Sequence, residues 1–118
     1  GGYASPADFY NPPAPWLYPT IIDAQNQGRA VYVAEGVTVT LTGLHIVGGN
    51  GSGLEGGSGN YPDAGGGLYL DQATTTISEC LIANNRSPMA GGVYVNRGDL
   101  FMSHNVITAN TAISANGG

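Results

Sequence analysis

Two stretches of twenty residues, GGLYLDQATTTISECLIANN at 66–85 and GGVYVNRGDLFMSHNVITAN at 91–110, decide how this sequence folds. They align without a gap, so that Leu68 corresponds to Val93 and each later residue corresponds to the one 25 positions further on. Self-similarity at one fixed period is typical of proteins built from stacked repeats. The rest of the chain is therefore interpreted against this period.

An earlier copy of the pattern precedes these two. RAVYV at 29–33 and TVTLTGLHI at 38–46 match it at offsets of 36 or 37 residues, and PTIID at 19–23 indicates a partial repeat before that. The longer offset comes from an insertion at about 50–65, NGSGLEGGSGNYPDAG, whose glycine, serine, asparagine and proline content is typical of a surface loop.

Within each repeat, apolar and polar residues alternate with the period of half-buried strands, as Val31 and Val33 do around Tyr32. A repeat of 25 residues with three such short strands cannot bury its apolar side alone, whereas stacked repeats can. The sequence therefore predicts an all-β parallel β-helix, a solenoid of about three coils plus a partial one, with three short strands per coil. The expected inward stacks are Val31, Leu68 and Val93; Leu41, Ile77 and Met102; and Ile46, Ile82 and Ile107.

Composition supports a folded chain and excludes some partners. Of 118 residues 20 are glycine, yet 42% are hydrophobic and only 9% are charged, which is more apolar than a disordered segment. There is no lysine and the formal net charge is −5, so the chain lacks the basic surface that nucleic acid requires. No apolar run approaches the ~20 residues of a membrane span. The single cysteine, Cys80, aligns with Leu44, and we expect it to be a buried small hydrophobe.

The two ends of the chain differ from the repeats. Residues 1–18 form a proline-rich arm, which we expect to pack over the first coil or against a partner through its aromatic residues Phe9, Tyr10, Trp16 and Tyr18. The repeats occupy 19–118, and the 25-residue offset would map Gly117 onto Gly92, in mid-repeat. We therefore expect a piece of a longer protein, or another chain that covers the open end.

The step I-x-x-N followed by G-G-[LV]-Y links the repeats, as in IANN at 82–85 leading to GGVY at 91–94 and ITAN at 107–110 leading to NGG. This motif resembles the repeats of bacterial right-handed parallel β-helix proteins, and is most similar to secreted or surface types such as the passenger regions of autotransporters and polymorphic outer-membrane proteins. The resemblance implies a right-handed helix and an extracellular or cell-surface location. It does not fix the function, since this architecture serves lyases, adhesins, tailspikes and structural proteins alike.

A file of three tyrosines, Tyr32, Tyr69 and Tyr94, is the sharpest surface feature. Because their neighbours point inward, the three rings should stack up one outer face at the strand spacing of about 4.8 Å. Two interpretations stay open. The rings stabilise the fold by covering one another, or they form a platform for a sugar polymer or a partner protein.

Enzymatic sites are weakly indicated. The polysaccharide-cleaving members imply clustered aspartates, but Asp71 aligns with Ala34 and Asn96, so no second carboxylate stacks beside it. His45 and His104 fall at different repeat positions without an evident nucleophile partner. Calcium is a weak alternative cofactor, for which Glu55, Asp63 and Asp71 are the candidate ligands.

These observations favour a non-enzymatic structural or adhesive module of a secreted or cell-surface protein, taking part in an envelope layer, fibre or appendage. Its partners would be other protein subunits, further copies of itself through open coil ends, or surface glycans. The alternative is a glycan-binding or polysaccharide-lyase β-helix whose catalytic coils lie outside this stretch.

Overall fold

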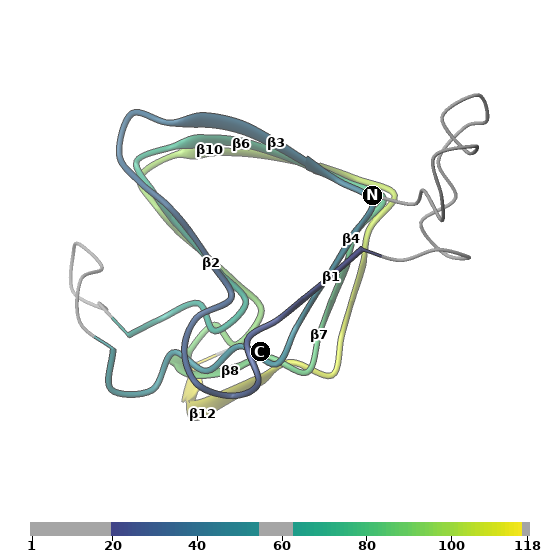
Figure 1. The fold of residues 1–118 in the computed structure, drawn as a ribbon. Coiled ribbons are helices and arrows are strands. Elements are labelled where there is room, and N and C mark those ends of the chain that lie inside the picture. The colour runs from purple at the N-terminus through teal and green to yellow at the C-terminus, as the bar shows by residue number, and fades with distance from the viewer. Residues whose placement is uncertain (1–19, 55–62, 117–118) are drawn as a thin grey trace.

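The computed structural model describes residues 20–54 and 63–116, and over these the chain is all-β with parallel sheets (Figure 1). The predicted arm at 1–18 and Glu55 lie outside the described residues. The strands are β1 Thr20–Asp23, β2 Val31–Val33, β3 Thr38–Thr42, β4 Leu44–Val47, β5 Leu68–Asp71, β6 Thr74–Ser78, β7 Leu81–Ala83, β8 Arg86–Met89, β9 Val93–Asn96, β10 Asp99–Ser103, β11 Val106–Thr108 and β12 Thr111–Asn116.

The strands pair into four parallel sheets that the chain visits in turn. Their orders are β2-β5-β9, β3-β6-β10, β1-β4-β7-β11 and β8-β12. We call β2–β4, β5–β8 and β9–β12 the first, second and third repeats. In Figure 1 the strands of each sheet lie over one another and adjacent sheets meet at corners, so that equivalent residues of successive repeats are neighbours in space.

The strand registers confirm the alignment made from sequence. Leu68 pairs with Val93 and Val31 with Leu68. The same agreement holds for Ile77 opposite Met102 and for the partial repeat, where β1 pairs with β4. Of the predicted inward residues, Leu68, Ile77, Ile46 and Ile82 belong to the buried cluster, and Val31, Leu41 and Val93 are partly buried against it. Met102 and Ile107 are 38% and 49% exposed. The other members of the cluster are Val33, Leu70, Ala73 and Cys80. Cys80 is fully buried, as expected.

Two expectations were wrong. The second and third repeats each contain a fourth strand, β8 and β12, where the sequence predicted three. In β8, RSPM, a proline interrupts the alternating pattern, so the segment does not look like a strand. The constant offset also fails inside β12: Ala112 pairs with Ser87 at 25 residues, but Asn116 pairs with Met89 at 27. The predicted mapping of Gly117 onto Gly92 lies outside the described residues.

Corners form where the backbone enters the left-handed region at the same repeat positions. The corner before β4, β7 and β11 has Gly43, Glu79 and His104 with φ of 67°, 51° and 54°. Glycine adopts this conformation without steric cost, whereas other residues pay ~1–2 kcal/mol. The second and third repeats keep this turn with non-glycine residues. Stacking against the preceding repeat must therefore offset the conformational cost of the left-handed backbone at Glu79 and His104.

Asparagine side chains fasten these corners to the preceding repeat. Asn110 accepts a hydrogen bond from Asn85 N at its Oδ1 (3.1 Å) and donates from its Nδ2 to Ile82 O (2.9 Å). Asn105 makes the same pair of bonds at the other corner, to Cys80 N (2.9 Å) and Ile77 O (2.8 Å). We call Asn85, Asn105 and Asn110 the corner asparagines.

Candidate functional site

The three predicted tyrosines do stack. Tyr32 pairs with Tyr69, and Tyr69 with Tyr94, in the sheet β2-β5-β9. The ring centroids are 5.5 Å apart in the first pair, nearly parallel at 24°, and 5.1 Å apart in the second, tilted by 45°. Only the first ring is well exposed, at 43%, while Tyr69 is fully buried and Tyr94 is partly buried. The stack therefore offers one accessible ring.

Arg29, just before β2, covers the middle of this stack. Its guanidinium carbon lies 4.7 Å from the centroid of Tyr69 and 5.8 Å from that of Tyr32, a cation–π geometry. The same group donates from Nη2 to Ala64 O (2.9 Å) and from Nε to Gly65 O (3.1 Å). Arg29 thus connects the segment that leads into β5, at Ala64 and Gly65, to the rings of Tyr32 and Tyr69.

Asp71, at the end of β5, closes the stack on the other side. Its carboxylate is 5% exposed and accepts hydrogen bonds from the Tyr32 hydroxyl (2.9 Å, at Oδ2) and from Asn96 Nδ2 (2.9 Å, at Oδ1). Asn96 holds the equivalent position in the third repeat. Both oxygens are engaged within the fold, which leaves this carboxylate poorly placed as a general base.

The environment shifts three ionisation equilibria. Burial raises the pKa of Tyr69 above its ordinary value, and the nearby Asp71 charge adds to the effect. Partial burial and the hydrogen bond to Asp71 raise the pKa of Tyr32. Burial lowers the pKa of the Arg29 guanidinium, and the facing tyrosines oppose this. The phenols therefore stay neutral, and an arginine stays charged at physiological pH.

A second candidate site is the open face, meaning the side of β9, β10 and β11 that faces away from the second repeat. Its apolar residues are exposed although their equivalents are not: Met102 is 38% and Ile107 49% exposed, against 0% for Ile77 and Ile82. Phe101 and Val106 add further exposed apolar surface, at 60% and 47%. Each of these three strands pairs on one side only within the described chain.

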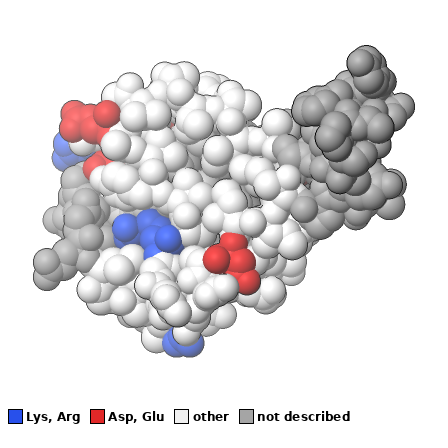
Figure 2. Space-filling view, in the orientation of Figure 1, with Lys and Arg blue, Asp and Glu red and all other residues white. Residues whose placement is uncertain are grey.

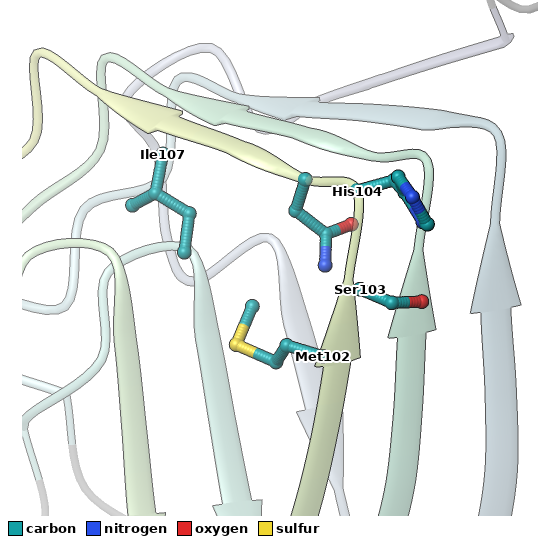
Figure 3. Close-up of a pocket in the computed structure, with 5 residues that line it drawn as sticks. Met102, Ser103, His104 and Ile107 are labelled. Carbon is teal, nitrogen blue, oxygen red and sulfur yellow. The ribbon is translucent and has the colours of Figure 1, made fainter.

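A hollow of about 250 Å³ lies on this face, lined by Met102, Ser103, His104, Asn105 and Ile107. Figure 3 shows Met102 and Ile107 directed into it from adjacent strands, while Ser103 and His104 point away. The lining of the hollow is mixed, with the apolar side chains of Met102 and Ile107 beside the polar residues Ser103, His104 and Asn105.

Apart from Arg29 and Asp71 in the tyrosine site, charged side chains contribute little to either site. Figure 2 shows charged side chains only as small separate patches on the face in view. The calcium candidates stay a prediction: Asp63 is half-buried, Asp71 is engaged as above, and Glu55 is not described. Within 20–54 and 63–116 no group of three histidine, cysteine or acidic residues is placed to hold a metal ion.

Sequence reasoning missed Arg29 and Asn96 as members of the tyrosine site. The alignment placed Asn96 opposite Asp71, and this pairing could have indicated a hydrogen bond between the two side chains. Nothing local marks Arg29, because its partners Ala64 and Gly65 are the last two residues of the insertion. The arm residues Phe9, Tyr10, Trp16 and Tyr18 fall outside the described residues.

Comparison with protein-family models, curated proteins and solved structures finds no match. In the part of the chain that the structure describes, no helix has the length and apolar character needed to cross a membrane.

Proposed function

We propose that the chain is a right-handed parallel β-helix of about three coils plus a partial one, and that it is a non-enzymatic structural or adhesive module of a secreted or cell-surface assembly. The parallel sheets visited in turn and the 25-residue register support the architecture. The proposed role is to extend a rigid stack and to join other subunits through its end.

One observation carries the role. The same repeat positions are fully buried where a following repeat covers them and 38–49% exposed where the described residues include no following repeat, as at Ile77 and Met102 or Ile82 and Ile107. Exposed apolar surface beside unpaired strand edges is the usual basis for association by strand addition. The tyrosine site supports the same role, because its polar groups bind one another and brace the outer face.

The enzymatic alternative has less support. A lyase needs a carboxylate or basic group free to take a proton near an open binding surface. Here Asp71 is almost buried and already accepts two hydrogen bonds. A single exposed ring, that of Tyr32, is a short platform for a polymer.

Surface-immobilised chain, exposed in turn to soluble chain and to a synthetic peptide of residues 91–110, tests the proposal. We expect association of at least one of these through the open face, and no unsaturated product from pectin-like polymers with or without calcium. Absence of any association, or release of unsaturated product, would overturn it.

A further inference from the structure

The turn that follows β4 carries the tripeptide Asn50-Gly-Ser, an N-x-[ST] acceptor sequence for N-linked glycans. A second acceptor sequence, Asn85-Arg-Ser, belongs to the second repeat. The two sequences lie in neighbouring layers, since Asn50 pairs with Arg86 in an isolated parallel bridge. The surroundings of each asparagine side chain therefore decide which of them the fold can leave glycosylated.

The carboxamide nitrogen of Asn50 is open. Its Oδ1 accepts a hydrogen bond from Ser52 N (3.0 Å), which fixes the side chain. Among the described residues, Asn50 Nδ2 makes no hydrogen bond and does not belong to the buried polar atoms. Ser52, whose hydroxyl completes the acceptor sequence, is exposed. A sugar on Asn50 Nδ2 therefore breaks no hydrogen bond of the described fold.

The backbone of this turn is held between two layers. Asn50 N donates to Gly28 O (2.7 Å) on one side, and Gly51 N donates to Arg86 O (2.8 Å) on the other. A Cβ on Gly51 would lie 2.6 Å from Asp63 O, so this part of the chain passes close to its neighbours. Because described backbone lies on both sides, the exposure of the turn does not come from an end of the described stack.

Asn85 is the opposite case. It is 1% exposed, and its Nδ2 donates to Ile46 O (3.1 Å) and to Asn110 Oδ1 (3.0 Å). Ser87, the hydroxyl residue of the same acceptor sequence, is fully buried. A glycan on Asn85 Nδ2 would break at least one of these buried hydrogen bonds and would need room inside the core. A chain glycosylated at Asn85 therefore cannot adopt this fold.

We propose that Asn50 is an N-glycosylation site and that Asn85 carries no glycan in the folded protein. The donor is an oligosaccharide on a polyisoprenyl pyrophosphate, the substrate class of oligosaccharyltransferases. Asn50 Nδ2 forms a bond to the anomeric carbon of the first sugar and loses a proton. The bond from that carbon to the pyrophosphate oxygen breaks, and its electron pair leaves with the pyrophosphate. The inference rests on the secreted or cell-surface location in the proposed function, because such proteins pass through the compartment where this transfer occurs.

Secretion of the full chain from cultured eukaryotic cells, behind an added signal peptide, tests the site. Removal of the glycan by an amidase in heavy-oxygen water converts each glycosylated asparagine to a mass-labelled aspartate, which peptide mass spectrometry locates. We expect the label at Asn50 and none at Asn85. Ser52→Ala should lose the label, whereas the matched variant Ser52→Thr keeps the hydroxyl and should retain it. Removal of the glycan should shift the melting temperature by under about 3 °C, since the side chain is on the surface.

A thiol at the same position tests the fit without the cellular machinery. Asn50→Cys chain from cells that do not glycosylate is treated, while folded, with a saccharide iodoacetamide. We expect full modification of the new thiol and an unchanged circular dichroism spectrum, while Cys80, which is fully buried, stays unmodified as an internal control.

Three results would each overturn the proposal: a secreted, folded chain without a glycan at Asn50, a glycan at Asn85, or loss of the fold when the new thiol is modified. None of them involves the open face. Association through that face would therefore still be observed, and the proposed function would stand.

Discussion

Asn85 joins three repeats with one side chain. Its carboxamide accepts from Gly49 N and donates to Ile46 O in the first repeat, and it donates to Asn110 Oδ1 (3.0 Å) in the third. The residue is 1% exposed, so water cannot replace these partners. A buried polar side chain with all its partners in place is favourable, and the same partners left unpaired are costly.

Asn85→Ala is therefore expected to lower the free energy of unfolding by about 3 kcal/mol, because it leaves the buried N–H of Gly49 and the buried carbonyl of Ile46 without a hydrogen-bond partner. Urea denaturation measures the change. Asn50→Ala is the matched control, since that side chain accepts one exposed bond from Ser52 N, and should cost under about 1 kcal/mol. Equal losses in the two variants would contradict the role given to Asn85.

The raised pKa values of Tyr32 and Tyr69 predict alkaline sensitivity. A tyrosine whose pKa is higher folded than unfolded contributes its full stabilisation below the unfolded value of about 10 and loses it as the pH rises through the folded value. The free energy of unfolding should thus fall above pH ~10. Tyr32→Phe, which removes the hydroxyl that binds Asp71, should reduce that slope; an unchanged slope in urea titrations at several pH values would refute the assignment.

At the scale of elements, the apolar spacing was enough to predict register, because stacking places identical repeat positions opposite one another. Leu68 opposite Val93 and Ile82 opposite Ile107 follow from counting residues. The fourth strand was not predictable in this way, since β8 is held by pairing with β12 and its sequence has no strand pattern. The role of Arg29 was not predictable for a similar reason, because its partners depend on the path by which the insertion returns to the sheet.

Glycines at the entry to the second and third repeats permit close approach of the backbone that begins the last strand of the same repeat, β8 or β12. A Cβ built on Gly66 would overlap the carbonyl group of Arg86, whereas one on Gly28 would meet nothing within 4 Å. Gly66→Ala should therefore displace backbone and lower the free energy of unfolding by about 3 kcal/mol, while Gly28→Ala stays within about 1 kcal/mol. Thermal and urea unfolding of the pair check this, and similar stabilities would show that the backbone at Gly66 and at Arg86 can move apart without cost.

For the whole molecule, the decisive asymmetry is between a covered and an uncovered layer. Sequence alignment makes Ile82 and Ile107 equivalent and predicts both to be inward-facing. Their exposures of 0% and 49% differ because, among the described residues, a following layer covers Ile82 and none covers Ile107, a difference that no local pattern encodes. We therefore expect Ile82 to contribute to folding and Ile107 to contribute to association.

Lysine at each of these two positions tests that separation. Ile82→Lys forces a charge into the core without a partner and should prevent stable folding. Ile107→Lys leaves its charge in water, so it should change the free energy of unfolding by under about 1 kcal/mol while abolishing binding of the 91–110 peptide to the open face. Circular dichroism melts and surface binding measure the two effects. Retained peptide binding by a folded Ile107→Lys chain would mean that association uses another surface, whereas a loss of both fold and binding would show that the open face is already part of the closed core.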